Sequence, residues 1–98
     1  MNLLNQPSAP EQKKIAAWTA CRAVDGLSAA DYRIDAYGHL IRWRDYGSQG
    51  ENGWEIDHAL PTALGGADHV GNCRALHWRQ NRSLGGLLGN ALKGAMTR

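Results

Sequence analysis

The sequence predicts one small domain of the α+β class, and three observations support this prediction. A helix-start signal near residue 8 precedes apolar residues at three- and four-residue spacing. Residues 32–43 and 54–58 form short β-prone runs with glycine-rich sequence between them. A chain of 98 residues closes about one hydrophobic core. We therefore expect helices and antiparallel strands in separate segments of a single domain.

The first helix is predicted to begin at Ser8-Ala9-Pro10-Glu11, which combines a capping box with proline at an early helical position. Gly26 is placed to end this helix. Its apolar stripe predicts a scaffold role and consists of Ile15, Ala17, Trp18, Cys21 and Val24. Residues 28–31 repeat the capping pattern, but β-type sequence follows so soon that we expect a turn or a single helical turn.

The strands are predicted from the middle of the chain onward. Residues 32–43 favour a hairpin with Gly38 at its turn, and three glycines make residues 45–53 a loop. Residues 54–58 alternate large apolar and polar side chains, which is typical of a strand, and Pro61 stops it. A second strand is expected at 72–76 and a short helix at 77–84.

Composition excludes several classes of protein. No run approaches the roughly 20 apolar residues of a membrane-spanning helix, and residues 1–7 lack the pattern of a secretory signal, so we expect a soluble, cytoplasmic protein. Cys21 and Cys73 are far apart and neither lies in a CxxC pair, which argues against a structural zinc site or a disulfide framework. With no phenylalanine, four tryptophans and three tyrosines must supply the large aromatic contacts.

Charge is unevenly distributed along the chain. Residues 1–68 carry six basic and nine acidic side chains, whereas residues 69–98 carry five basic side chains and no acid. Arginine outnumbers lysine four to one in this second part, which suits contact with a polyanion such as nucleic acid. An unevenly charged solvated surface is the alternative interpretation.

Residues 54–83 contain the pattern that carries chemistry. Asp57 and His58 end the first strand, Asn72 opens the second, and Asn81 lies on the helix that follows. With Gly65-Gly66 and Pro61 in register, this segment resembles the HNH endonucleases of the ββα-metal superfamily, in its small single-domain type. The resemblance implies a ββα-metal (HNH) core, here joined to an N-terminal helix and an upstream β-hairpin.

The resemblance also implies a role for each of these residues. His58 would be the general base, and Asp57 and Asn81 would bind one divalent metal ion, with Mg²⁺ favoured and Mn²⁺ or another divalent ion as alternatives. Asn72 would fix the imidazole, either through its backbone carbonyl or by bracing the loop with its side chain. The cysteine pairs that hold zinc in some family members are missing here, so no structural zinc is expected.

Basic and aromatic side chains surround the motif. Arg79 and Arg82 share a helix face and Arg74 lies just upstream, so we expect these three to contact the nucleic-acid backbone, with Arg42 and Arg44 as outer contacts. His77 is interpreted as a packing or second-shell residue rather than a rival metal ligand. His39 and His69 are expected to be solvated. Trp54 and Trp78 are expected to pack in the core.

The sequence predicts three segments along the chain. They are a flexible N-terminus at 1–10, one nuclease domain at 11–86 with its motif at 54–84, and a glycine-rich basic tail at 87–98. The implied function is metal-dependent hydrolysis of DNA, double-stranded by preference, to 5′-phosphate and 3′-hydroxyl ends by a prokaryotic or phage-encoded enzyme. Double-strand cleavage would require a dimer or sequential nicks, and the tail is the expected contact with a second copy or a partner protein. The alternatives are a binding or inhibitory protein that reuses the fold, and a nuclease subunit of a larger DNA-processing machine.

Overall fold

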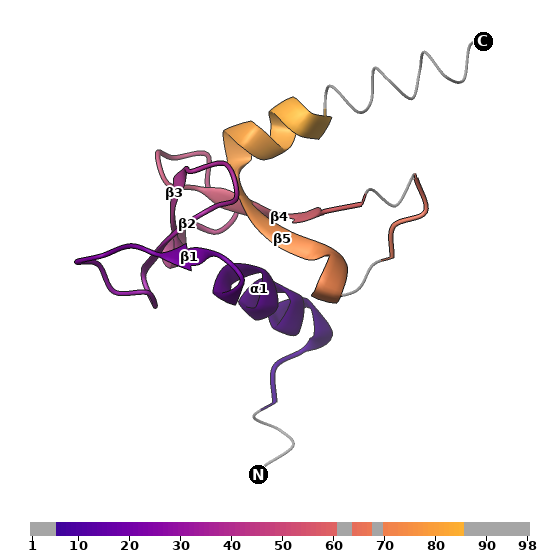
Figure 1. Ribbon diagram of the computed structural model, residues 1–98. Coiled ribbons are helices and arrows are strands. Elements are labelled where there is room, and N and C mark those ends of the chain that lie inside the picture. The colour runs from indigo at the N-terminus through magenta and orange to yellow at the C-terminus, as the bar shows by residue number, and fades with distance from the viewer. Residues whose placement is uncertain (1–5, 61–63, 68–69, 86–98) are drawn as a thin grey trace.

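The computed structural model describes residues 6–60, 64–67 and 70–85, which form an α+β fold with two helices and two antiparallel sheets (Figure 1). The predicted class is therefore confirmed. In chain order the elements are α1 (Ala9–Thr19), β1 (Arg22–Ala23), β2 (Tyr32–Ile34), β3 (Leu40–Arg42), the 3-10 helix η2 (Trp43–Asp45), β4 (Trp54–His58), the 3-10 helix η4 (Val70–Asn72), β5 (Cys73–His77) and a helix at 78–85.

Helix α1 begins where the sequence predicts it, but it ends earlier. The Ser8 hydroxyl accepts a hydrogen bond from the Glu11 backbone N–H at 3.3 Å, and proline occupies the first turn. The predicted end at Gly26 is wrong, because Arg22 and Ala23 leave the helix and pair with β2. The Arg33 guanidinium donates to the Thr19 and Cys21 carbonyls at 3.1 and 3.0 Å, and it thereby satisfies backbone acceptors at the helix end.

The first sheet has the strand order β1-β2-β3. Its β2–β3 hairpin is the predicted one, and Gly38 in the turn has φ +88°, which is the left-handed region that favours glycine. Residues 28–31 form the expected turn. The strand β1 was not predicted, because two exposed residues at a sheet edge carry no recognisable alternation.

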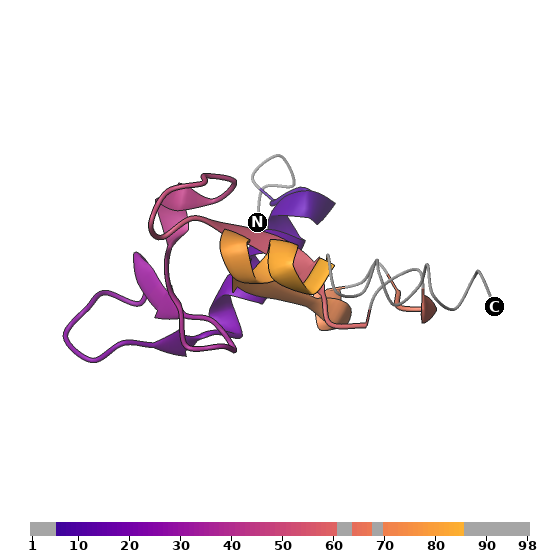
Figure 2. The ribbon, with the colours of Figure 1, turned by 90° about the horizontal axis from the view of Figure 1, so that it is seen from above.

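The second sheet is the antiparallel pair of β4 and β5. Its register places Trp54 opposite His77 and His58 opposite Cys73, so β5 begins one residue later than predicted, as does the helix after it. Trp54, Cys73 and Ala75 belong to the core cluster shared with α1, and the partly buried Ile56 packs against it. Figures 1 and 2 show α1 and the 78–85 helix on opposite sides of this two-stranded ribbon.

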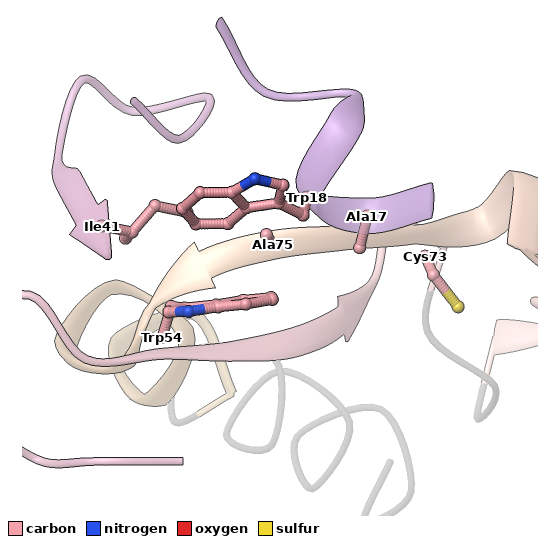
Figure 3. Packing of buried hydrophobic residues seen from close by; sticks show 6 residues of the cluster. All are labelled: Ala17, Trp18, Ile41, Trp54, Cys73 and Ala75. Carbon is pink, nitrogen blue, oxygen red and sulfur yellow. The ribbon is translucent and has the colours of Figure 1, made fainter. Parts of the chain in front are cut away.

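The core lies between α1 and the β4–β5 ribbon, where the buried hydrophobic side chains gather (Figure 3). The Trp18 and Trp54 rings are 5.2 Å apart, and Trp43 packs against both. Each buried indole also has a hydrogen-bond acceptor, since Trp54 donates to the Arg42 carbonyl at 2.8 Å and Trp18 donates to the Ala29 carbonyl at 3.2 Å. Tryptophans thus fill the core while their N–H groups tie it to the surrounding loops.

Trp78 differs from Trp54, the other tryptophan in the second half of the chain. It was predicted to pack in the core, but it is only half-buried and is not among the clustered core residues. Its indole donates to the Gly50 carbonyl at 2.8 Å, and so it ties the start of the 78–85 helix to the glycine-rich loop. Within the described part of the chain, no helix is long and apolar enough to cross a membrane.

Candidate functional site

Asp57 and Arg74 form the central ion pair of the candidate site. They are register partners on β4 and β5, and the Arg74 Nε donates to the Asp57 Oδ2 at 3.1 Å. The two side chains are 27% and 31% exposed, so solvent reaches both of them. The Arg74 guanidinium also lies over the Tyr37 ring at 5.6 Å from its centroid. Asp57, the predicted metal ligand, thus pairs with Arg74, which was predicted from the sequence to contact the nucleic-acid backbone.

A second pair lies two residues away on the same face of β4. The Arg82 Nε is 3.5 Å from the Glu55 Oε1, which is a buried oxygen with no hydrogen-bond partner among the described residues. With its amide oxygen turned toward Arg82, Gln49 accepts from this guanidinium at 3.1 and 3.3 Å. Sequence reasoning did not select Glu55, although residues i and i+2 of a strand share a face, and that spacing could have linked it to Asp57.

Two arginines contact the exposed side of Trp78. The Arg79 and Arg82 guanidinium carbons lie 5.0 and 5.2 Å from its ring centroid. Both distances fall within the range of a cation–π contact. Two cations thus lie over one indole, and both arginines are exposed.

Asn72 braces the loop that joins the two strands. Its backbone carbonyl accepts from the Ala59 N–H at 2.7 Å, and its side-chain oxygen accepts from the Leu60 N–H at 2.8 Å. Its side-chain N–H group donates to the Leu60 and Ala67 carbonyls at 2.9 and 2.8 Å. These bonds fix the two residues that directly follow His58, so Asn72 determines how the chain leaves the strand.

His58 is the last residue of β4 and is half-buried. Ladder pairing continues through it, because it lies opposite Cys73 and the next residue bonds to Asn72. Consecutive residues of a regular strand point to opposite faces, so Asp57 and His58 do not share one face. β4 is regularly paired up to His58, so no distortion of this strand turns the two side chains to one face.

Asn81 lies within the 78–85 helix and is half-buried. Residues three and four apart on a helix share a face, so Asn81 lies on the side of Trp78 and next to Arg82, which reaches Glu55 on β4. Asn81 is the fourth residue of this helix, which begins directly after β5. This placement depends on the short link between β5 and the helix.

His77 is buried, and backbone groups engage both of its ring nitrogens. The Nε2 lies 2.7 Å from the Glu51 carbonyl, which can only accept, and the Nδ1 accepts from the Arg79 N–H at 3.2 Å. In this arrangement Nε2 faces an acceptor and Nδ1 faces a donor, and the ring caps the first turn of the helix. This arrangement matches a packing role for His77 rather than metal binding.

His39 is exposed, with its Nε2 3.2 Å from the Gln80 amide oxygen, and His69 lies outside the described residues.

Asp35 is a buried carboxylate whose structural role the sequence did not reveal. It is only 2% exposed, and its carboxylate accepts from three backbone N–H groups, those of Tyr37, His39 and His77, each at 2.9 Å. It therefore links the hairpin turn to the end of β5. Nothing in its local sequence could signal a partner 42 positions away.

Cys21 lies just after α1 and its thiol is partly buried. Burial raises the pKa of its thiol above the ordinary value, and the nearby Asp35 carboxylate raises it further, while Arg33 and a hydrogen bond to the Ala75 backbone lower it. Nucleophilic cysteines require the opposite shift. Cys21 and Cys73 are both free thiols, as expected, and Cys21 is only half-buried.

The donor set at the candidate site fits a hard divalent cation in its chemistry. Asp57 and Asn81 offer a carboxylate and an amide oxygen, which suit Mg²⁺ bound with water and phosphate in its other positions. The carboxylate is partly exposed, so its pairing with Arg74 is reversible. Among the residues that the structure describes, no three His, Cys, Asp or Glu side chains gather as a metal-binding group.

No protein-family model, curated protein or solved structure matches this chain.

Proposed function

We propose that the protein is a metal-dependent endonuclease of the HNH type that hydrolyses DNA phosphodiester bonds. The observation that carries this proposal is the unit of β4, loop, β5 and helix over residues 54–85, with Asn72 bracing the backbone directly behind His58. That arrangement agrees with the role that the resemblance gives to Asn72. The products would have 5′-phosphate and 3′-hydroxyl ends.

His58 acts as the general base in this proposal. A neutral imidazole takes a proton from the water that attacks the phosphorus, and such a base contributes about 10²- to 10⁴-fold to a rate. Asn72 contributes by holding Ala59 and Leu60, which fixes the direction in which the chain leaves His58. Because β4 is regular up to His58, the imidazole works from the end of the strand rather than from the face that carries Asp57.

Asp57 and Asn81 would hold the metal ion, which would supply charge neutralisation at the phosphate and at the departing 3′ oxygen. Arg74, Arg79 and Arg82 hold the nucleic-acid backbone. Phosphate contacts carry no sequence information, so binding is salt-sensitive and weakly specific. One site cuts one strand, and double-strand cleavage therefore needs a second copy or a second nick.

Nicking of a supercoiled plasmid with Mg²⁺ or Mn²⁺ tests the proposal. The native chain should convert supercoiled DNA to open circles, and EDTA should stop it. His58→Ala should lower the rate by about 10²-fold or more, because the base is lost. His39→Ala is the control for loss of an imidazole, since His39 is exposed and contacts Gln80 on the helix without a proposed catalytic role, and it should leave the rate within about twofold.

Two results would contradict the proposal. Supercoiled DNA left intact from roughly pH 6 to pH 9 with several divalent metals would exclude a stand-alone nuclease. Equal cutting by the native chain and His58→Ala would exclude His58 as the base. If DNA is bound but not cut, the alternative of a binding protein that reuses this fold gains support.

A further inference from the structure

The candidate site contains two arginine–carboxylate pairs, and in the first pair each side chain has a different proposed ligand. Asp57 is proposed to hold a cation, and Arg74 is proposed to hold a phosphate, yet these two side chains bind each other at 3.1 Å. Glu55 and Arg82 repeat the arrangement at 3.5 Å on the same face of β4. Each arginine thus neutralises a carboxylate.

Exposure decides whether such a pair is fixed or exchangeable. A fully buried ion pair is hard to separate, because either charge left alone in the interior is destabilising. Asp57 and Arg74 are each about three-tenths exposed, so water can replace either partner at little loss of free energy. The Tyr37 ring keeps the Arg74 guanidinium beside the site after it separates from Asp57.

We propose that Arg74 is the built-in counter-cation of Asp57, and that it is displaced to a phosphate when a divalent cation binds this carboxylate. The inference rests on the proposed function and specifies how its site is regulated. A cation on Asp57 releases Arg74 for a polyanion, and a phosphate on Arg74 releases Asp57 for a cation. By linkage, each ligand strengthens the binding of the other to the same extent.

Arg74 and Arg82 differ in the partners that hold them. Arg74 is the direct register partner of Asp57, and its carboxylate bond is the shorter of the two. Arg82 is held by Glu55, by the Gln49 amide and by the Trp78 ring. Removal of Arg82 would free Glu55 beside Asp57, whereas Arg22 is exposed on β1 outside the proposed site, so Arg22→Gln changes the net charge by the same amount and is the matched control.

Titration of the purified chain with Mn²⁺ in the absence of nucleic acid tests the competition, with the spectroscopic signal of free Mn²⁺ as readout. Arg74→Gln should bind Mn²⁺ about threefold more tightly than the native chain, because the exposed ion pair no longer competes. Arg22→Gln should change the affinity by less than about half that factor. Asp57→Asn should abolish the site in either background.

The possible results separate the inference from the proposed function. Tighter binding by Arg74→Gln alone supports the exchange. Equal affinity of the native chain and Arg74→Gln, with binding still lost in Asp57→Asn, overturns the exchange and leaves the metal site intact. Absence of Mn²⁺ binding in the native chain and in Arg74→Gln overturns both the exchange and the metal site.

The phosphate half of the exchange is tested with a fluorescent DNA oligonucleotide, using Ca²⁺ or EDTA in the buffer. In the native chain, Ca²⁺ should raise the oligonucleotide affinity, and in Arg74→Gln this gain should shrink by about threefold. An undiminished gain in Arg74→Gln would overturn the proposal, since direct contact between phosphate and metal would then explain the coupling alone.

Discussion

Asp35 is the residue on which the two sheets depend. Its carboxylate accepts from two N–H groups of the hairpin turn and from the His77 N–H at the end of β5. Hydrogen bonds to a charged group are the stronger kind, and a buried N–H group left without an acceptor is destabilising. The stability of the candidate site therefore depends on a residue that contacts none of its proposed catalytic groups.

Replacement of this carboxylate should measure its importance. We expect Asp35→Ala to lower the free energy of unfolding by about 3 kcal/mol, because one buried and two partly buried backbone donors lose their acceptor. Urea denaturation followed by tryptophan fluorescence measures the change. Asp25→Ala is the control, since Asp25 is exposed, and it should alter stability by less than about 0.5 kcal/mol. Equal effects of the two substitutions would contradict the proposed role of Asp35.

Cys21 makes stability depend on pH in the alkaline range. Burial raises the pKa of its thiol in the folded chain above the ordinary value of 9.0, so the unfolded chain loses this proton first. The free energy of unfolding should therefore fall as pH rises above 9.0, and stability from this group is fully present below that value. Urea denaturation on both sides of this pH should show a smaller fall for Cys21→Ala than for the native chain. Parallel curves would exclude the effect.

At the scale of elements, the glycine-rich loop before β4 is held against the 78–85 helix. Gly53 is buried, its carbonyl accepts from the Trp78 N–H at 3.1 Å, and Gly50 accepts from the Trp78 indole. A Cβ atom at Gly53 would collide with the Ser48 backbone and would lie 3.1 Å from the Trp78 ring. Only glycine therefore lets the loop and the helix approach this closely.

The two glycines at 53 and 85 should respond oppositely to alanine. Gly53→Ala should lower the free energy of unfolding by about 2 to 3 kcal/mol, because the Ser48 backbone must move. Gly85 is helical and has nothing within 4 Å of an added Cβ, so Gly85→Ala should raise stability by up to about 1 kcal/mol. Thermal unfolding followed by circular dichroism distinguishes the two. A stabilising Gly53→Ala would exclude the close approach.

Local sequence patterns predicted the elements better than their ends. The Ser8 cap, the Gly38 turn and the alternation at 54–58 each act within a few residues, and the structure contains all three. The end of α1 was missed, because Arg33 binds the Thr19 carbonyl from a strand 14 positions later. Contacts between distant segments decide such boundaries, and periodicity does not record them.

In the candidate site, too, local features could be predicted and contacts between distant segments could not. Asn72 and His58 were predicted to act together, and the loop bonds of Asn72 follow from its position at the start of the second strand. The ion pairs of Asp57 and Glu55 could not be predicted, because they depend on the register of β4 against β5 and on the path of the helix. The sequence identified residues with chemistry, and tertiary contacts determined their partners.

At the scale of the whole molecule, fewer basic side chains after residue 68 are available to bind a polyanion than the lack of acids there indicates. Arg74 and Arg82 each have a carboxylate partner on β4, which lies in the acidic part of the chain. Arg79 is exposed and contacts the Trp78 ring. Of the three proposed phosphate contacts, Arg79 thus has no carboxylate to release within the described residues, and it should contribute to binding with or without a metal ion.

Salt dependence of DNA binding tests this difference. Each phosphate contact that is removed should reduce the slope of log Kd against log salt by about 1, so Arg79→Ala should show this loss in both EDTA and Ca²⁺. The loss should be similar for unrelated DNA sequences, because a phosphate contact does not read bases. Arg22→Ala is the matched control, since Arg22 is exposed on β1 in the first sheet and should leave the slope unchanged. An equal change in both variants would mean that net charge, rather than a surface built around Trp78, attracts the polyanion.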